Sequence, residues 1–289
     1  MDNIDEIINE SKESKSKKDE WVKNKKLEKE KLFEKIDTTS KMIIEDSNLF
    51  KNYLDILSKF DKYSISNSLL ILDQQPDASL LKDKDEWISL EGIKLKKKTK
   101  TISLLKPGEA YTKKDGTIIK PFNIYEMIDI SQTDMKLFEK KKIFDDKVML
   151  KAFLYDCPVD IKVDDYLKNN KASYWDSKKG LLYIQRGANP NSLFLDISKE
   201  LSKVNLETND KDASEFKSKC ASYIICKKNG IDVSNYHFED IPESFKSMEA
   251  KDIRNELSSI KEVVSDFNNR VNIYMDSLYR KSRSKDMER

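Results

Sequence analysis

Histidine is almost absent from this sequence, because His237 is the only one among 289 residues. Neutral imidazole is the commonest protein ligand of catalytic zinc, so this single residue argues against a histidine-based metal centre. Cysteine is scarce as well. The three cysteines, Cys157, Cys220 and Cys226, are widely spaced and form no C-x-x-C pair. This pattern predicts reduced thiols rather than a disulfide framework.

Long apolar runs and an excess of one charge are also missing. No run reaches the roughly 18 apolar residues of a transmembrane helix, and the first residues are charged, unlike a secretory signal. We therefore expect a cytoplasmic protein with no membrane partner. The 54 Lys and Arg residues nearly balance 52 Asp and Glu residues, so the net charge of +2 identifies no partner. Any basic surface must be local.

Hydrophobic periodicity predicts long helices at both ends of the chain and two modest domains between them. Residues 1–37 are mostly charged and have sparse apolar positions, which predicts a solvated helix or arm. Residues 244–289 keep near-heptad apolar spacing, which predicts an amphipathic helix that docks on its own domain or pairs with a partner. We place the two domains at 38–134 and 147–243, with a polar helical linker between them.

The expected fold class is α/β of the α+β kind. Apolar spacing predicts helices over 41–60 and 65–72, and alternating residues beyond Trp87 predict a small antiparallel sheet with a tight turn at Asp115-Gly116. The following domain is expected to be mainly helical. It should contain one hairpin, with its turn at Lys178 to Gly180, and two helices, at about 190–206 and 213–229.

Positive charge is concentrated between Lys94 and Lys114, where eight lysines accompany a single acid, Glu109. Lysines beside aromatic rings are typical of single-stranded nucleic-acid surfaces, where the cations bind phosphates and the rings stack on bases. A solvated face that blocks strand pairing is the alternative interpretation. Four aromatic residues flank the segment in the sequence: Tyr63, Trp87, Tyr111 and Phe122. For Tyr63 and Trp87, a place in the hydrophobic core is equally expected.

The stretch KYSISNSLLILDQQPDA, then Trp87, Gly92, KLKKKTKTISLLKP and IDISQT at 128–133, resembles the amino-terminal domain of ArdC-like and LtrC-like antirestriction proteins of mobile genetic elements. The resemblance covers roughly residues 40–133 and implies binding of single-stranded DNA. It departs at Lys98, where the family tends to have glycine.

The candidate nucleic-acid-binding residues that follow from the lysine run and the resemblance are Tyr63, Ser64, Asn67, Gln74, Trp87, Lys94, Lys96, Lys97, Lys98, Lys100, Gln132 and Thr133. We expect the lysines to bind phosphates and the two rings to stack on bases. For Asn67, Gln74, Gln132 and Thr133, hydrogen bonds that shape the fold are at least as consistent with the sequence as contacts with bases.

Residues 194–207, FLDISKELSKVNLE, resemble the zincin-type peptidase helix that carries HExxH, with Lys199, Glu200 and Lys203 in place of His, Glu and His. The next helix resembles the one that supplies the third zinc ligand. Its matching position is Lys219, although the alignment can shift by one turn. An ammonium group has no lone pair for a metal and repels a divalent cation. We therefore expect no zinc, no other cofactor and no peptidase activity.

Glu200 is expected to pair with Lys199, Lys203 or Lys219, and His237 to lie on the surface or in packing. An ordinary charged helix face without peptidase ancestry is the alternative. Together these features predict a single-stranded DNA-binding protein of a plasmid, conjugative element or phage, with a dead peptidase-like domain. The protein is expected to protect or handle transferred DNA. It should use no small-molecule substrate. The rival interpretation is a scaffold or inhibitor that binds a host or mobile-element protein through the dead cleft and terminal helices.

Overall fold

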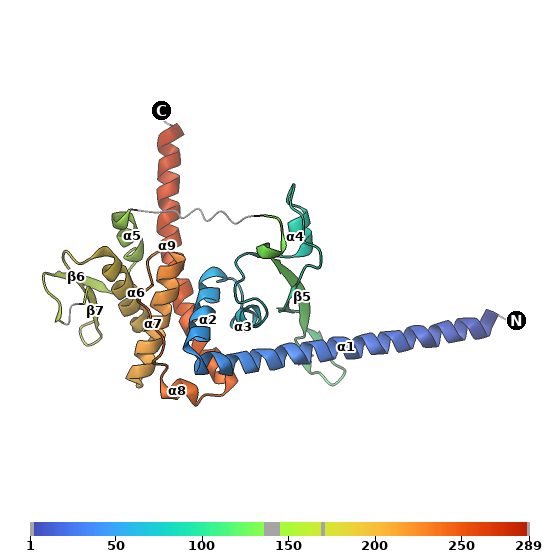
Figure 1. The fold of residues 1–289 in the computed structure, drawn as a ribbon. Helices are drawn as coiled ribbons and strands as arrows, with labels where there is room; N and C mark the ends of the chain where they lie inside the picture. Colours follow the sequence, from blue (N-terminus) through green and yellow to red (C-terminus); the bar gives the residue numbers. More distant parts are fainter. Residues whose placement is uncertain (1–2, 136–144, 169–170, 288–289) are drawn as a thin grey trace.

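The computed structural model describes residues 3–135, 145–168 and 171–287 (Figure 1). Long helices lie at both ends, α1 (Asn3–Glu45) and α9 (Ala250–Met287), and the described residues between them form shorter helices and three small sheets. The far ends of both long helices extend away from the body of the molecule (Figure 1). This arrangement confirms the α+β class with long terminal helices. None of the helices in the described ranges is long and apolar enough to cross a membrane.

Helix α1 continues without a break through position 37, where the sequence suggested that an arm ends. Its second half is anchored by Leu32, Ile36, Ile43 and Ile44, which are buried and share one face, whereas positions 15–31 are largely exposed. A new helix, α2 (Ser47–Lys59), follows because the Asp46 carboxylate accepts the free backbone N–H groups at its start.

Helix α3 (Ile65–Gln74) packs on the first sheet. The sheet has the antiparallel order β1 (Leu81–Lys82), β5 (Phe122–Asp129) and β2 (Ile102–Pro107). Short helix α4 (Lys84–Ile88) follows β1, and the 3-10 turn η1 (Ile130–Gln132) follows β5.

A separate hairpin of β3 (Tyr111–Thr112) and β4 (Ile118–Ile119) turns at Gly116. The φ of this glycine is +86°, which other residues rarely adopt. Both the small antiparallel sheet and the tight turn confirm the prediction from the sequence.

The second half opens with α5 (Asp146–Phe153) and a sheet of order β6 (Asp160–Asp164), β8 (Leu181–Gln185) and β7 (Ser173–Asp176). The β7–β8 hairpin is the predicted one, whereas the parallel pairing of β6 with β8 was not expected. Helices α6 (Pro190–Leu206) and α7 (Lys211–Lys228) lie where the periodicity predicted them, and the short α8 (Glu243–Lys246) precedes α9. The predicted helical linker falls mostly on residues 136–144, outside the described ranges.

One hydrophobic core joins the two halves of the chain. Helix α7 packs against α2, α6 and α9, and the Phe50 ring of α2 lies 5.3 Å from the Phe216 ring of α7. The apolar stripe of α9, from Ile253 to Val271, is buried against this core, so α9 docks on its own chain. The shared core holds α3 and the first sheet in place relative to α6 and α7. The boundaries at 134 and 147 stay a prediction.

Candidate functional site

The basic segment, residues 94–100, is a loop that is fixed to the residues after β5. Leu95 forms an isolated antiparallel bridge with Thr133. On either side of it, the Lys96 N–H donates to the Gln132 carbonyl at 2.8 Å, and the Asp134 N–H donates to the Lys94 carbonyl at 3.1 Å. The backbone of the segment is therefore held in place while its lysine side chains project into solvent.

All five lysines of the basic segment are exposed: Lys94, Lys96, Lys97, Lys98 and Lys100. Within the described residues none of them forms an ion pair with a carboxylate, and the Lys96 Nζ donates instead to the Ser131 carbonyl at 2.6 Å. Lys98 has a φ of +59°, in the left-handed region that favours glycine. The segment thus presents a cluster of positive charge that no carboxylate pairs with in the described part of the chain.

The side-chain amides of Asn67 and Gln74 on α3 are hydrogen-bonded to the backbone of β2, an edge strand of the first sheet. The Asn67 amide donates to the Leu105 carbonyl at 2.8 Å and accepts from the Leu105 N–H at 2.9 Å. Gln74 makes the same pair of bonds with Ser103, at 3.0 and 2.9 Å. The two amides lie seven residues apart on one helix face and meet alternate residues of β2, so they cover an edge strand. Their role in this structure is to shape the fold.

Three other polar candidates are also tied into the fold. The Ser64 hydroxyl caps α3 by accepting from the Asn67 N–H at 3.2 Å. Thr133 is buried and donates to the Ile130 carbonyl at 2.8 Å, and the Gln132 Oε1 accepts from the Lys100 N–H at 3.3 Å. Gln132 therefore supports the backbone of the basic segment, and Thr133 closes the turn beneath it.

Trp87 belongs to the core and not to the surface. Its side chain is fully buried with Ile128 and Ile130, and its Nε1 donates to the Ile128 carbonyl at 2.8 Å. A base cannot stack on this ring unless the ring leaves the core. This burial corrects our expectation that Trp87 stacks on a base. Of the two interpretations that the sequence allowed, core packing describes Trp87.

Tyr63 is half-buried, with its ring edge-on to Phe60 at 5.9 Å, and burial raises the pKa of its hydroxyl to about 12. The flanking rings that are exposed are Tyr111 on β3 and Phe122 at the start of β5. Phe122 also contacts Phe33 of α1 at 6.0 Å. Tyr111 and Phe122 are thus the exposed rings that flank the basic segment in the sequence. Phe122 pairs with Pro107, at the end of β2 that lies away from the basic segment.

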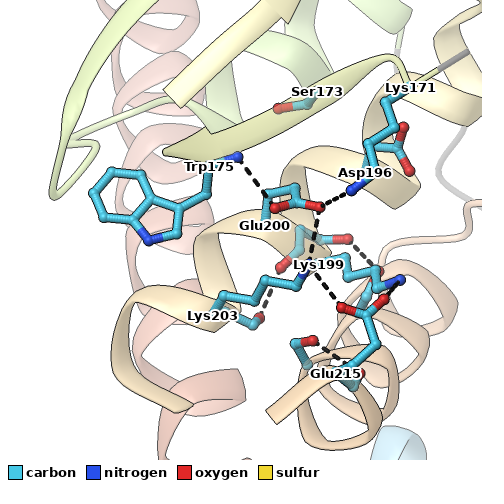
Figure 2. A network of polar contacts seen from close by, with 12 residues as sticks. Lys171, Ser173, Trp175, Asp196, Lys199, Glu200, Lys203 and Glu215 are labelled. Carbon is cyan, nitrogen blue, oxygen red and sulfur yellow. Dashed lines mark hydrogen bonds and ion pairs between the residues drawn. The ribbon is translucent and has the colours of Figure 1, made fainter. Parts of the chain in front are cut away.

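Glu200, which the sequence resemblance matched to the glutamate of HExxH, is buried on α6 (Figure 2). Its Oε1 accepts from the Lys203 Nζ at 3.1 Å and the Lys171 Nζ at 3.2 Å, while its Oε2 accepts from the Trp175 N–H at 3.1 Å. One turn earlier, Asp196 accepts from the Ala172 N–H at 2.7 Å. The predicted Glu200–Lys203 pair is confirmed. The two carboxylates also hold the β7 edge on α6.

A second carboxylate, Glu215 of α7, faces Lys199 and Lys203 (Figure 2). The Lys203 Nζ lies 2.7 Å from the Glu215 Oε2, and the Lys199 Nζ contacts the Glu215 Oε1. Burial alone would raise the pKa of Glu215, but hydrogen bonds from both lysines lower it to about 2. We name the cluster of Lys171, Lys199, Glu200, Lys203 and Glu215 the ion-paired cluster.

Lys219 lies outside the ion-paired cluster, and of the three lysines expected as partners of Glu200 it is not the one that pairs. Its Nζ lies 5.3 Å from the centre of the Phe238 ring. Glu215 lies one helical turn before Lys219 and contacts Lys199 and Lys203. No local pattern in the sequence pointed to Lys171 or to the Trp175 N–H.

The residues of the ion-paired cluster do not fit a divalent metal. The Nζ atoms of Lys199 and Lys203 are ammonium donors without a lone pair for a metal, and both already bind Glu215. Among the residues that the structure describes, no group of three or more histidine, cysteine, aspartate or glutamate side chains could hold a metal ion. The only histidine, His237, is exposed and lies 3.9 Å from Glu239.

No protein family matches this sequence, and no curated protein does. Among solved structures, the chain is similar to two crystal structures of the antirestriction ArdC protein from plasmid R388. The metal-free structure aligns with a TM-score of 0.47 and the Mn(II)-bound structure with 0.41. In both cases the identity is 12%, and the alignment covers 74% of this chain and 84% of that chain. Both TM-scores lie below 0.5 and do not establish a shared fold.

Proposed function

We propose that this protein binds single-stranded DNA through the basic segment and the exposed rings of Tyr111 and Phe122. The observation that carries the proposal is the set of five exposed lysines without carboxylate partners among the described residues, on a loop that backbone hydrogen bonds fix in place. Because the backbone of this loop is already fixed, phosphate binding does not have to order it, which lowers the cost of binding. Neighbouring Lys106, Lys113, Lys114 and Lys120 are exposed and extend the positive surface toward the β3–β4 hairpin.

Binding should depend little on base sequence. The amide side chains that could read base edges, Asn67 and Gln74, are both hydrogen-bonded to β2. Lysine–phosphate contacts and stacking on aromatic rings act on every nucleotide alike. Single strands should be favoured over duplex, because only unpaired bases can stack on Tyr111 and Phe122.

The biological setting that we propose is a plasmid, conjugative element or phage, where the protein protects or handles transferred DNA. This part rests on the resemblance of residues 40–133 to ArdC-like and LtrC-like proteins. We further propose that the chain has no peptidase activity. The proposal is supported by the resemblance of residues 194–207 to the HExxH helix, with lysines in place of both histidines, and by the ion pairs of Lys199 and Lys203 with Glu215.

A protein scaffold is the second candidate function, and the first half of α1 favours it. This part of the helix extends from the body (Figure 1), and Trp21 and Leu27 are 61% and 49% exposed. Large apolar side chains on a protruding helix are typical of surfaces that contact another protein. A scaffold would bind DNA only weakly and would not distinguish single strands from duplex.

Fluorescence anisotropy with labelled single-stranded and duplex oligonucleotides separates the two functions. The test variant combines Lys96→Ala, Lys97→Ala and Lys100→Ala, and the control combines Lys18→Ala, Lys23→Ala and Lys31→Ala, three exposed lysines of α1. Both variants lose the same charge. We expect the test variant to bind single strands at least about tenfold more weakly and the control to match the wild type. Equal loss in both variants would contradict a local site.

A further inference from the structure

A small polar cavity lies where α2, α7 and α9 meet, apart from the basic segment and the ion-paired cluster. Its volume is about 90 Å³, close to the size of a small oxyanion. Polar side chains supply much of its lining, namely Asp61, Lys228, Lys261, Ser265, Asn268 and Asn272. The proposed DNA site does not account for these residues.

Asn268 contributes a buried donor that has no partner. The side chain is only 4% exposed, and its Nδ2 forms no hydrogen bond among the described residues. The orientation of the amide is fixed, because its Oδ1 accepts from the Asn229 Nδ2 at 3.0 Å, and that Nδ2 also donates to the Ile225 carbonyl at 2.8 Å. Burying an unsatisfied N–H is costly, so this donor favours an acceptor bound in the cavity.

Lys261 adds a positive charge that no carboxylate pairs with in the described part of the chain. Its Nζ donates to the Tyr63 carbonyl, and burial lowers the pKa of its ammonium group. Lys228 also lines the cavity, but it is paired with Asp61. Two lysines and one aspartate leave a charge of +1 in the cavity. One monoanion would neutralise it.

We propose that this cavity binds one phosphate group as a monoanion, with the Lys261 Nζ and the Asn268 Nδ2 donating to its oxygens. Two sources share this chemistry: free inorganic phosphate and a phosphodiester of single-stranded DNA. The second source rests on the proposed function. The position of the cavity favours this source, because the Lys261 Nζ donates to the carbonyl of Tyr63, beside the start of α3. The first source is independent of DNA binding.

The test measures thermal unfolding of the full chain while inorganic phosphate or dimethyl phosphate replaces chloride at constant ionic strength. We expect both anions to raise the melting temperature of the wild type. Lys261→Met should lose this shift, and Lys251→Met, an exposed lysine of the same helix, should keep it. Asn268→Asp should also lose it, because the carboxylate still accepts from Asn229 but places an oxygen where the donor was. This variant should remain at least as stable as the wild type without phosphate, since the new carboxylate adds a negative charge to a cavity with a charge of +1.

Binding of a labelled single-stranded oligonucleotide identifies the source. An approximately tenfold weaker affinity of Lys261→Met, the effect of one lost charge-assisted hydrogen bond, would assign the cavity to a DNA phosphate. A phosphate shift with unchanged DNA affinity would assign it to free phosphate, and this result would stand even if the basic segment bound no DNA. The proposal is overturned if neither anion stabilises the wild type and Lys261→Met binds the oligonucleotide as tightly as the wild type does.

Discussion

Lysine dominates both the basic segment and the ion-paired cluster, but the surroundings of the lysines differ. In the basic segment the side chains are exposed and form no ion pairs with carboxylates among the described residues. In the cluster, Lys171, Lys199 and Lys203 all bind Glu200 or Glu215. A count of lysines therefore does not identify a binding surface. The partners of each ammonium group decide whether its charge is available to a ligand.

The largest expected effect comes from converting the cluster into a metal site with the double variant Lys199→His and Lys203→His. Two imidazoles four residues apart on α6 would face the Glu215 carboxylate and complete a zinc-binding triad. We expect calorimetry to detect zinc binding by the double variant, with a melting temperature that rises by several degrees in the presence of zinc.

Adding Glu215→Gln to the double variant is the matched control, because it removes the third ligand with little change in shape. Zinc binding should then weaken strongly. If the double variant bound no zinc, Glu215 would not occupy the position of a third ligand. A one-turn shift of the helix alignment from Lys219 to Glu215 would then be wrong.

The next largest effect is expected from Glu200→Gln. The amide cannot accept from Lys171, Lys203 and the Trp175 N–H as the carboxylate does, so the free energy of unfolding should fall by about 2 kcal/mol. Urea unfolding measures the loss, with the exposed Glu207→Gln as control. Affinity for single-stranded DNA should stay unchanged. Unaltered stability would show that the buried carboxylate does not hold β7 on α6.

Glu215 predicts a smaller effect that depends on pH. Its folded pKa of about 2 lies below the ordinary value of 4.5, so its stabilisation is complete above pH 4.5 and is lost as the pH falls toward 2. Because the side chain is half exposed, solvent screening reduces the contribution to about 1 kcal/mol. Urea unfolding between pH 6 and pH 3 should show a weaker acid dependence in Glu215→Gln than in the wild type. Parallel curves would contradict the pairing.

The smallest effect concerns Lys98 in the basic segment. Its φ of +59° is unfavourable for a side chain with a Cβ, so Lys98→Gly should raise the free energy of unfolding by about 0.5 kcal/mol. The variant should bind single-stranded DNA slightly more weakly, because it loses one charge. Lys97→Gly loses the same charge without relieving a positive φ and should not be stabilised. Equal stabilities of the two variants would show that Lys98 carries no strain.

The sequence predicted the features that depend on local patterns. Apolar spacing located α3, α6, α7 and α9, and the Asp115-Gly116 pair located the β3–β4 turn, because these signals depend on neighbouring residues. The Glu200–Lys203 pair is also local, since its residues lie three apart on one helix.

The features that the sequence did not predict depend on distant contacts. The parallel pairing of β6 with β8 joins segments separated by about twenty residues, and the core brings Phe50 against Phe216. Trp87 could equally have been exposed, because its burial depends on strand β5. The cavity beside Lys261 is formed by three helices from different parts of the chain, so no motif marks it.

The salt dependence of single-stranded DNA binding tests whether the basic segment is the DNA-binding surface. Each phosphate that a lysine neutralises contributes about 0.7 to the slope of log affinity against log salt. The slope of the variant with Lys96→Ala, Lys97→Ala and Lys100→Ala should therefore be lower by about 2, whereas Lys199→Ala with Lys203→Ala should leave it unchanged. An unchanged slope in the first variant would contradict the assignment of the basic segment as the DNA-binding surface.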